Sequence, residues 1–304
     1  MCVIFNPSAG RGRALRRLKE LRHSLGPRAL FRPTRGPGHG EEMAFEAASE
    51  GFPVIGAAGG DGTVHEVANG LLRAGRADVV LAVYPVGSAN DYADSLGLAK
   101  NWWLCSDLTA SVRMVDVGLA RAETGRQKYF INGLGLGFNG AVTLESRRIQ
   151  RLQGVALYGL ALFRALLFRF ACPRMAVRFD EELRQVPTLA LTIAIGRREG
   201  GFILAPNAVV DDGWFDYLHA GSLRRWELIR YFPRMISGRI PTDHPKLWMG
   251  RCRQVTIQSE APLVAHTDGE FFCRPEEGIR QLDIRILPRA LSVQTTSSAR
   301  TEKA

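Results

Sequence analysis

The chain has 304 residues, of which 46% are hydrophobic and 23% are charged. This composition excludes wholesale disorder and collagen-like structure, and the length suits one large domain or two domains of medium size. The five cysteines are far apart and include no Cys-x-x-Cys pair, which argues against a zinc site and a disulfide framework. We expect a cytoplasmic protein, because the first residues read as a strand rather than a signal peptide and no uncharged apolar run reaches 18 residues.

The net charge of +10 is concentrated in two basic segments. Residues 11–35 contain nine Lys or Arg against one Glu, and residues 147–178 contain seven Arg and no acidic residue. Such segments fit an anionic partner, which can be nucleotide phosphates, nucleic acid or an anionic membrane. No basic groove studded with aromatic residues and no recognition motif supports nucleic acid, so we expect no nucleic-acid partner.

The first 118 residues alternate between apolar strands and helices. This alternation predicts an α/β domain with an open, mainly parallel sheet. In such a sheet the ligand crevice lies beyond the carboxyl ends of the strands, where the Gly-rich loops of this region also fall. The expected elements are strands at 3–5, 53–58 and 79–84 and helices at 13–24, at 41–50 and after residue 63.

After residue 119 the chain reads as short strands separated by turn residues. We therefore predict an α/β domain over 1–118 and a β-rich second domain, a sandwich, over 119–290. The polar tail 291–304 is expected to be disordered. Helices are expected at 141–170 and 222–238, and strands at 128–131, 175–179, 189–195, 215–220, 254–258, 263–267 and 281–287.

Two loops of the first domain have residues suited to phosphate binding. Asn6-Pro7-Ser8-Ala9-Gly10-Arg11-Gly12 lies between a strand and a helix, where backbone N–H groups can converge on phosphate oxygens, although an ordinary turn explains it equally well. Gly59-Gly60-Asp61-Gly62-Thr63 lets the backbone approach a ligand closely, and Asp61 beside phosphates requires a cation. Thr63 is also suited to cap the following helix, with Glu66 completing a capping box.

These loops, in this order, resemble the bacterial members of the diacylglycerol kinase and sphingosine kinase family of lipid kinases, whose nucleotide domain is shared with NAD kinase and phosphofructokinase. The resemblance extends over about residues 2–290, and Gly87-Ser88-Ala89-Asn90-Asp91 corresponds to the family's Gly-Thr-x-Asn-Asp motif. It implies an NAD kinase-like domain in which ATP is bound by Asn6, Pro7, Ser8, Ala9, Gly10, Thr34, Gly59, Gly60, Asp61, Gly62, Thr63, Val64, His65, Glu66, Ser88 and Asn90.

The second domain contains an Asp-Asp-Gly segment and an Asp-Gly-Glu motif that are similar to those of the family. In the first, the resemblance implies Mg²⁺ held by Asp212 and by the backbone carbonyls of Val209 and Trp214, while a hairpin turn is the structural alternative. In the second, it implies the catalytic base, because phosphoryl transfer to an alcohol needs a carboxylate that accepts the hydroxyl proton. The sequence leaves open whether Asp268 or Glu270 takes that proton.

Three further carboxylates, Asp61, Asp91 and Asp116, match positions that organise Mg²⁺ and water in relatives, although Asp116 can instead form a local bridge. His266 is expected to be a strand residue. Residues 147–172 interleave arginines with large apolar side chains, and Arg164 and Arg169 exclude a simple spanning helix. This segment either lies in a membrane interface or covers the core of the second domain, and the sequence favours neither.

The sequence thus predicts a kinase that uses ATP and Mg²⁺ to phosphorylate the hydroxyl of a lipid alcohol. The resemblance implies diacylglycerol as the acceptor and phosphatidic acid as the product. A sphingoid base, ceramide or phosphatidylglycerol is the alternative acceptor, and a non-catalytic regulator that binds nucleotide or lipid is the alternative class. Intact Asp61, Asp268 and Glu270 argue against the regulator. Peripheral contact with an anionic membrane is expected, and a homodimer is left open.

Overall fold

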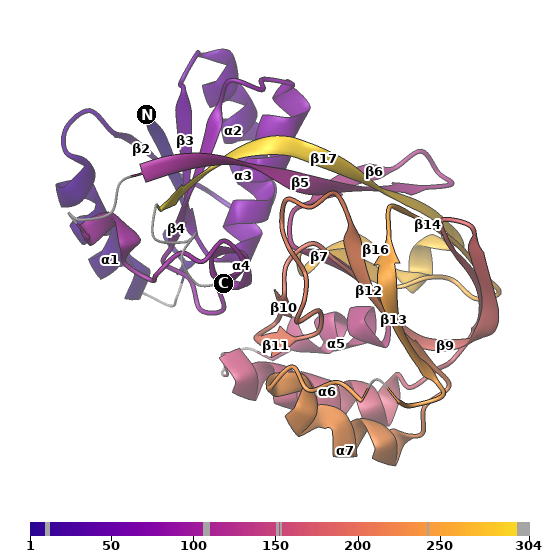
Figure 1. Cartoon of the computed structure of the whole chain (residues 1–304). Coiled ribbons are helices and arrows are strands. Elements are labelled where there is room, and N and C mark those ends of the chain that lie inside the picture. Colours follow the sequence, from indigo (N-terminus) through magenta and orange to yellow (C-terminus); the bar gives the residue numbers. More distant parts are fainter. Residues whose placement is uncertain (10–12, 106–109, 150–151, 153, 242, 297–304) are drawn as a thin grey trace. The chain divides into compact units, whose positions relative to one another are not determined.

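The chain folds into two compact units (Figure 1). Unit 1 comprises Met1–Val117 and Pro288–Ala304, and unit 2 comprises Gly118–Leu287. The chain passes from unit 1 to unit 2 within strand β5 (Ala110–Ala122) and returns within strand β17 (Gln281–Thr296). The computed structural model describes residues 1–9, 13–105, 110–149, 152, 154–241 and 243–296.

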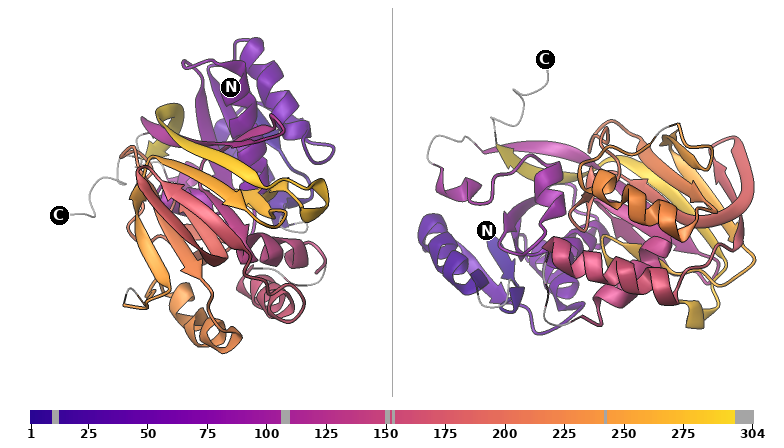
Figure 2. Two further views of the ribbon diagram at one scale, coloured as in Figure 1. Left: turned by 90° about the vertical axis from the view of Figure 1, so that its right-hand side faces the viewer. Right: turned by 90° about the horizontal axis from the view of Figure 1, so that it is seen from below.

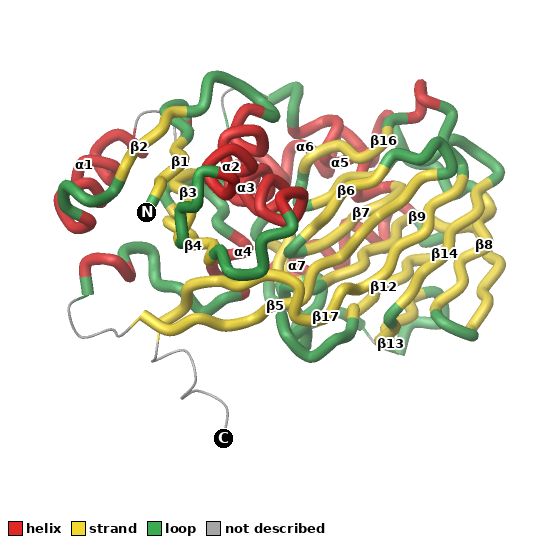
Figure 3. The backbone as a smooth tube through the Cα atoms, turned by 90° about the horizontal axis from the view of Figure 1, so that it is seen from above, coloured by secondary structure: helices red, strands yellow, loops and turns green. Residues whose placement is uncertain are grey.

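Unit 1 is built on a parallel sheet in the strand order β2-β1-β3-β4-β17. The central strands are short apolar runs, which suits burial on both faces of a parallel sheet. Helices α2 and α3 cover one face and α1 covers the other (Figure 3). The bounds are β1 Cys2–Phe5, α1 Arg13–Leu25, β2 Leu30–Pro33, α2 His39–Ser49, β3 Val54–Gly59, α3 Asp61–Ala74, β4 Val80–Pro85, α4 Asp91–Ser95 and a 3₁₀ turn Trp102–Leu104.

Unit 2 contains two antiparallel sheets that share strand β9, Glu182–Ala194. The first half of β9 pairs with β8, and the second half pairs with β7 and β12. One sheet has the order β16-β15-β7-β9-β12-β13, and the other contains β9-β8-β14-β17. The remaining strands are β6 Gln127–Phe130, β7 Gly133–Gly137, β8 Arg174–Phe179, β10 Arg198–Glu199, β11 Phe202–Ile203, β12 Phe215–Gly221, β13 Leu247–Cys252, β14 Gln254–Ser259, β15 Ala265–Thr267 and β16 Glu270–Cys273.

Three helices lie on the same side of the unit 2 strands (Figures 1 and 2): α5 (Phe138–Ser146), α6 (Gly154–Phe168) and α7 (Arg225–Ile236). Buried residues of all three helices pack in one cluster with residues of β9, β12 and β13. Helix α6 therefore covers the core of unit 2, which was one of the two roles open to it. Among the described residues, no helix is long and apolar enough to cross a membrane.

The expected fold class is confirmed: a mainly parallel α/β region is followed by a β-rich sandwich. The prediction of a disordered tail is wrong for residues 291–296, because these residues belong to β17. Leu291 and Val293 are buried, and Val293 pairs with Leu81 of β4. One of the polar side chains that suggested a tail is hydrogen-bonded instead: the hydroxyl groups of Thr295 and Ser111 lie 2.9 Å apart. The rest of the predicted tail, 297–304, lies outside the described residues.

Candidate active site

In unit 1, the loops that follow β3 and β4 pack backbone against backbone. The N–H groups of Val86 and Gly87 donate to the carbonyl of Gly59 at 3.2 and 2.9 Å. A Cβ atom on Gly87 would lie only 2.3 Å from the Cα of Gly60, so only glycine permits this approach. Two separate Gly-rich motifs of the sequence thus form one structure at the carboxyl ends of neighbouring strands.

Asp61 links these two loops. Its Oδ2 accepts the N–H of Asn90 at 2.8 Å, and its Oδ1 accepts the N–H of Tyr92 at 3.2 Å. Asn90 has a left-handed backbone with φ of 57°, which asparagine tolerates better than most residues. Asp91 lies between the two donors and is buried. Asp61 and Asp91 therefore lie in the same small region of unit 1.

The predicted capping box of Thr63 and Glu66 is wrong. Helix α3 begins at Asp61, its N-cap is Gly60, and no side chain bonds to this cap. Glu66 instead accepts the N–H groups of Gly38 at 2.7 Å and Gly40 at 2.9 Å. A carboxylate at the N-terminus of α2 satisfies free amides and interacts favourably with the helix dipole.

The other predicted nucleotide residues of unit 1 differ in exposure. Ser8 and Ser88 are exposed, and the N–H of Ser8 donates to Asn6 Oδ1 at 2.9 Å in the turn after β1. The side chains of Val64 and His65 are buried with that of Thr63, so a ligand could meet these residues only through their backbone. The N–H of Thr34 donates to the carbonyl of Phe5 at the end of β1. Gly10 lies outside the described residues.

Asp116 has the contacts of a local bridge. It is fully buried in β5, and its Oδ1 accepts the N–H of Arg289 in β17 at 2.8 Å. Arg289 has a φ of 51°, so the carboxylate stabilises an irregular point of that strand. These contacts favour the bridging alternative over a role in metal binding.

In unit 2, Asp268 occupies the turn between β15 and β16 and is held by three backbone donors. Its Oδ1 accepts the N–H groups of Asn132 and Gly133, both at 2.9 Å, and its Oδ2 accepts that of Ile131 at 3.0 Å. Its own N–H donates to the carbonyl of Gly133 at 2.8 Å. The carboxylate thus fixes the turn to the start of β7.

Glu270, two residues later, has a different environment. Its side chain is 37% exposed and pairs with Arg147 at 2.6 Å. The Arg147 guanidinium also donates to the carbonyl of Gly269 at 3.2 Å. The two carboxylates of the motif are therefore not equivalent, because one is committed to the backbone and the other faces solvent beside a guanidinium.

His266 is a buried strand residue, as the sequence predicts. Its Nδ1 accepts the N–H of Gly269 at 3.2 Å, which links its ring to the turn that carries Asp268 and Glu270. On its other side, Nε2 lies 2.8 Å from Oε1 of Glu199. Sequence reasoning missed Glu199, whose only signal is a single acidic residue beside two glycines in a basic and apolar stretch.

The Asp-Asp-Gly segment forms a turn before β12. Asp212 Oδ1 accepts the N–H of Trp214 at 3.1 Å, and its Oδ2 pairs with Arg251. Asp216 lies 3.8 Å from the same guanidinium. Burial raises the pKa of the Asp216 carboxyl; the charge of Arg251 offsets part of that rise, and the charge of Asp212 adds to it.

Among the described residues, no three His, Cys, Asp or Glu side chains gather closely enough to hold a metal ion. Mg²⁺ commonly binds through one or two carboxylates together with substrate phosphates and water, so a complete protein cage is not required. Asp61 with Asp91, and Asp212 with Asp216, are small sets of hard oxygen donors of this kind. Carboxylate oxygens of this kind are chemically suited to Mg²⁺, and in the second pair they face the Arg251 guanidinium.

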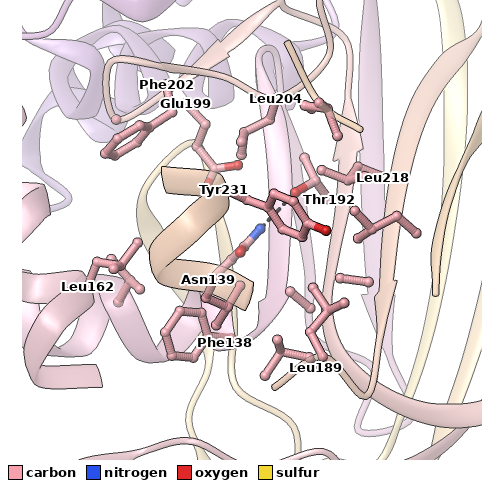
Figure 4. A pocket seen from close by; sticks show the side chains of 18 of the residues that line it. Phe138, Asn139, Leu162, Leu189, Thr192, Glu199, Phe202, Leu204, Leu218 and Tyr231 are labelled. Atoms are coloured by element: carbon pink, nitrogen blue, oxygen red, sulfur yellow. Dashed lines mark hydrogen bonds between the residues drawn. The ribbon is translucent and has the colours of Figure 1, made fainter. Parts of the chain in front are cut away.

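Unit 2 also contains an apolar cavity with a volume of about 100 Å³ (Figure 4). Its floor is formed by β9, β12 and β13, where Thr192 and Leu218 are cross-strand neighbours and share one face. Residues of α5, α6 and α7 form its walls, among them Phe138, Leu162 and Tyr231. A few polar side chains interrupt this lining, and two of them are bonded to each other: Asn139 Nδ2 donates to Thr192 Oγ1 at 2.7 Å.

Comparison with known proteins places this chain among lipid kinases. The family model of the diacylglycerol kinase catalytic domain matches residues 1–121, and that of the YegS C-terminal NAD kinase beta sandwich-like domain matches residues 133–295. A protein of Chromohalobacter salexigens named "Probable lipid kinase YegS-like" is 32% identical over 84% of this chain and 81% of its own length. The diacylglycerol kinase of Bacillus subtilis is 27% identical over 88% of this chain and 89% of its own length.

Solved structures share the fold. A diacylglycerol kinase from Bacillus anthracis superposes with a TM-score of 0.70 at 21% identity, covering 98% of this chain and 97% of that one. Yeast NADH kinase, solved with NADH, superposes with a TM-score of 0.52 at 8% identity, covering 97% and 83%. Given the two domain matches and the relative at 32% identity, this chain belongs to the diacylglycerol kinase and YegS family of lipid kinases.

Proposed function

We propose that the protein transfers the γ-phosphoryl group of ATP, with Mg²⁺, to the hydroxyl of a lipid alcohol whose hydrocarbon chain enters the cavity of unit 2. The cavity is the observation that carries this proposal. Its lining is almost entirely apolar, and burial of a hydrocarbon chain in such a lining is favourable. The relatives named diacylglycerol kinase make diacylglycerol the reference acceptor.

For the nucleotide, the proposal assigns the joined loops after β3 and β4 and the turn after β1. Their glycines and exposed Ser8 and Ser88 suit contact with phosphate oxygens. Asp61 with Asp91, and Asp212 with the carbonyls of Val209 and Trp214, would hold Mg²⁺. The metal, when bound, would offset the negative charge of the phosphates.

For proton transfer, we assign the acceptor role to Glu270 and a positioning role to Asp268. The oxygens of Asp268 already accept three backbone N–H groups, so a proton on this carboxyl would disrupt the turn. Glu270 is partly exposed, and the adjacent Arg147 holds it in place. A base must lie within hydrogen-bond reach of the substrate hydroxyl, which a solvent-facing carboxylate allows.

The activity test uses purified full-length protein, γ-labelled ATP, Mg²⁺ and separate micelles of diacylglycerol, a sphingoid base, ceramide and phosphatidylglycerol. Label is expected in at least one extracted lipid. A protein that binds an ATP analogue but labels none of them would be the non-catalytic regulator instead. The Glu270→Gln variant serves as the control for contaminating kinases.

A second part of the proposal concerns the outer faces of α6 and α7. Large apolar side chains are exposed on both helices: Phe163 and Phe168 on α6 are 53% and 72% exposed, and Trp226 and Ile229 on α7 are 52% and 58% exposed. Exposed arginines accompany them on α7. We propose that this surface, called here the α6–α7 face, rests on an anionic bilayer, because apolar side chains flanked by cations suit the headgroup boundary.

The arginines of the α6 region contribute less to this surface than their number suggests. Glu145 is almost fully buried, and Arg148, Arg164 and Arg169 all contact its carboxylate at 2.8–3.1 Å. Burial raises the pKa of Glu145, but the hydrogen bonds from Arg169 and Arg164 outweigh burial and keep that pKa below its ordinary value. Reversing the charge of these arginines would thus damage the fold as well as any membrane contact.

The membrane test therefore changes the exposed phenylalanines. Replacing Phe163 and Phe168 by Ser should reduce cosedimentation with phosphatidylglycerol vesicles at least tenfold, because a buried Phe side chain contributes about 1.5–3 kcal/mol. Leu183→Ser is the matched control, since Leu183 is a similarly exposed apolar residue, on β9. Unchanged vesicle binding by the double variant would refute the proposal that the α6–α7 face rests on the membrane.

A further inference from the structure

We infer that Glu199 selects the acceptor, and that the cavity is built for a lipid alcohol with a second hydrogen-bond donor, a hydroxyl or an ammonium, beside the hydroxyl to be phosphorylated. The inference rests on the proposed function and deepens it by naming the class of acceptor. Diacylglycerol lacks this second donor, because its remaining oxygens are ester oxygens that only accept hydrogen bonds.

The first support is the position of Glu199 in the cavity. It lies in the short strand β10, and among the described residues that line the cavity it is the only charged one. Figure 4 shows its side chain on the same side of the cavity as the hydrogen-bonded pair Asn139 and Thr192. Since most of the other lining residues are apolar, a lipid with its chain in the cavity would bring its headgroup to this polar end.

The second support is a series of contacts from Glu199 to the predicted catalytic turn. Glu199 Oε1 lies 2.8 Å from His266 Nε2, and His266 Nδ1 accepts the N–H of Gly269. Gly269 lies between Asp268 and Glu270. Room for the ring comes from Gly135, because a Cβ atom there would lie 2.3 Å from His266 Nε2. The polar end of the cavity is thus separated from the turn by one histidine side chain.

The third support is that the protein leaves this carboxylate incompletely paired. Oε2 of Glu199 is buried and has no hydrogen-bonding partner in the part of the chain that the structure describes. The N–H of His266 is close to Oε1 but does not point at it well enough to form a directed hydrogen bond. A buried carboxylate oxygen with unused lone pairs is costly, and a donor on the ligand would satisfy it.

The same geometry disfavours a lipid that offers only acceptors. An ester carbonyl beside Glu199 would place lone pairs against lone pairs, and the carboxylate would lose any water that it had without gaining a donor. A site that hydrogen-bonds a substrate hydroxyl or amine rejects analogues without this group, because its own polar atoms are then left unpaired. Glu199 would therefore determine which lipid is phosphorylated more than it determines how tightly lipids bind in general.

The test compares kcat/KM for three acceptors of equal chain length in the same mixed micelles: a monoacylglycerol, a sphingoid base and diacylglycerol. The wild type should prefer at least one of the two donor-bearing lipids over diacylglycerol by about tenfold or more, which corresponds to about 1.4 kcal/mol. Glu199→Gln retains the shape but replaces one acceptor oxygen by an amide donor, and should lose most of this preference. Glu276→Gln is the control, because Glu276 is an exposed residue of the same unit.

The outcomes separate this inference from the function on which it rests. A faster reaction with monoacylglycerol identifies a hydroxyl as the second donor, and a faster reaction with the sphingoid base identifies an ammonium; either supports the inference. Equal or better use of diacylglycerol by the wild type overturns it even if Glu199→Gln does not fold, and so does an unchanged preference in a folded Glu199→Gln. Failure to label any lipid refutes the proposed function instead.

Discussion

The two regions that the proposal brings into one reaction are constructed on different principles. In unit 1, the candidate nucleotide loops are short segments joined by backbone hydrogen bonds, glycine contacts and one carboxylate, Asp61. In unit 2, the cavity is assembled from side chains that span residues 138–247 and come from five strands, three helices and the loops between them. The close backbone contacts of the loops tolerate almost no other residue, whereas a substitution in the cavity wall changes the size of the cavity only gradually. Substitutions in the two regions should therefore fail in different ways.

The largest effect is expected at the turn of unit 2 that carries Asp268 and Glu270, to which we assign the proton transfer. Glu270→Gln should lower kcat by about 10²–10⁴, the usual contribution of a general base, and should leave the affinity for a nonhydrolysable ATP analogue within a few-fold. Because the Glu270 side chain is partly exposed, the melting temperature should not change. Steady-state kinetics and thermal unfolding together provide the measurement.

Asp268→Asn sharpens the distinction between the two carboxylates. Asparagine retains one acceptor oxygen and tolerates the φ of 51°, but the second oxygen becomes a donor that faces a backbone N–H. This variant should lose activity and also unfold at a lower temperature. If Glu270→Gln stayed near wild-type kcat while Asp268→Asn lost turnover without loss of stability, the two assigned roles would have to be exchanged.

The next largest effect is expected at the joined loops of unit 1. Asp61→Ala leaves the buried N–H groups of Asn90 and Tyr92 without their acceptor, which should cost about 1–3 kcal/mol of unfolding free energy. Affinity for the ATP analogue with Mg²⁺ should fall at least tenfold together with activity, because loop geometry and metal position both depend on this carboxylate. If Asp61→Ala bound the ATP analogue with wild-type affinity in a titration calorimeter, the role of Asp61 would be limited to stabilising the turn.

The smallest and most graded effect is expected in the cavity. Ala220 lines it, and Ala220→Leu would fill part of its volume. We expect about a tenfold loss of kcat/KM for a long-chain acceptor and little change for a short-chain one, with ATP-analogue affinity preserved. Ala171→Leu, at an exposed position of the same unit, is the control. Equal losses for both chain lengths would show that the substitution disturbs the fold rather than the chain-binding space.

The contrast between the units also explains what the sequence could predict. Residues 59–63 and 87–91 were recognisable because each motif is continuous and follows a strand, so that neighbouring strands bring the motifs together at one edge. The cavity is not continuous in the chain, and nothing in the spacing of Thr192, Glu199 and Tyr231 indicates that they share a surface. Glu199 in particular can be linked to the Asp-Gly-Glu motif only through its contact with His266, 67 residues later in the chain.

The incorrect predictions arose where a distant partner outweighed a local pattern. Thr63 and Glu66 have the spacing of a capping box, but Glu66 bonds to the start of α2. The arginines of 147–178 read as one basic surface, but Glu145, just ahead of that segment, binds three of them. The polar residues after 291 suggested a loose end, but Ser292 and Val293 pair with the edge of β4.

The path of the chain constrains how the protein can be made. Unit 2 is inserted into unit 1, and the strand that lies beside β4 is supplied by residues that follow unit 2 in the chain. During synthesis, the edge of β4 therefore stays without this neighbour until the ribosome has translated the whole of unit 2 and β17. An unpaired apolar edge invites wrong pairing with other chains. A fragment ending at residue 117 would keep that defect permanently, so the two units cannot be expected to be separated by a single cut.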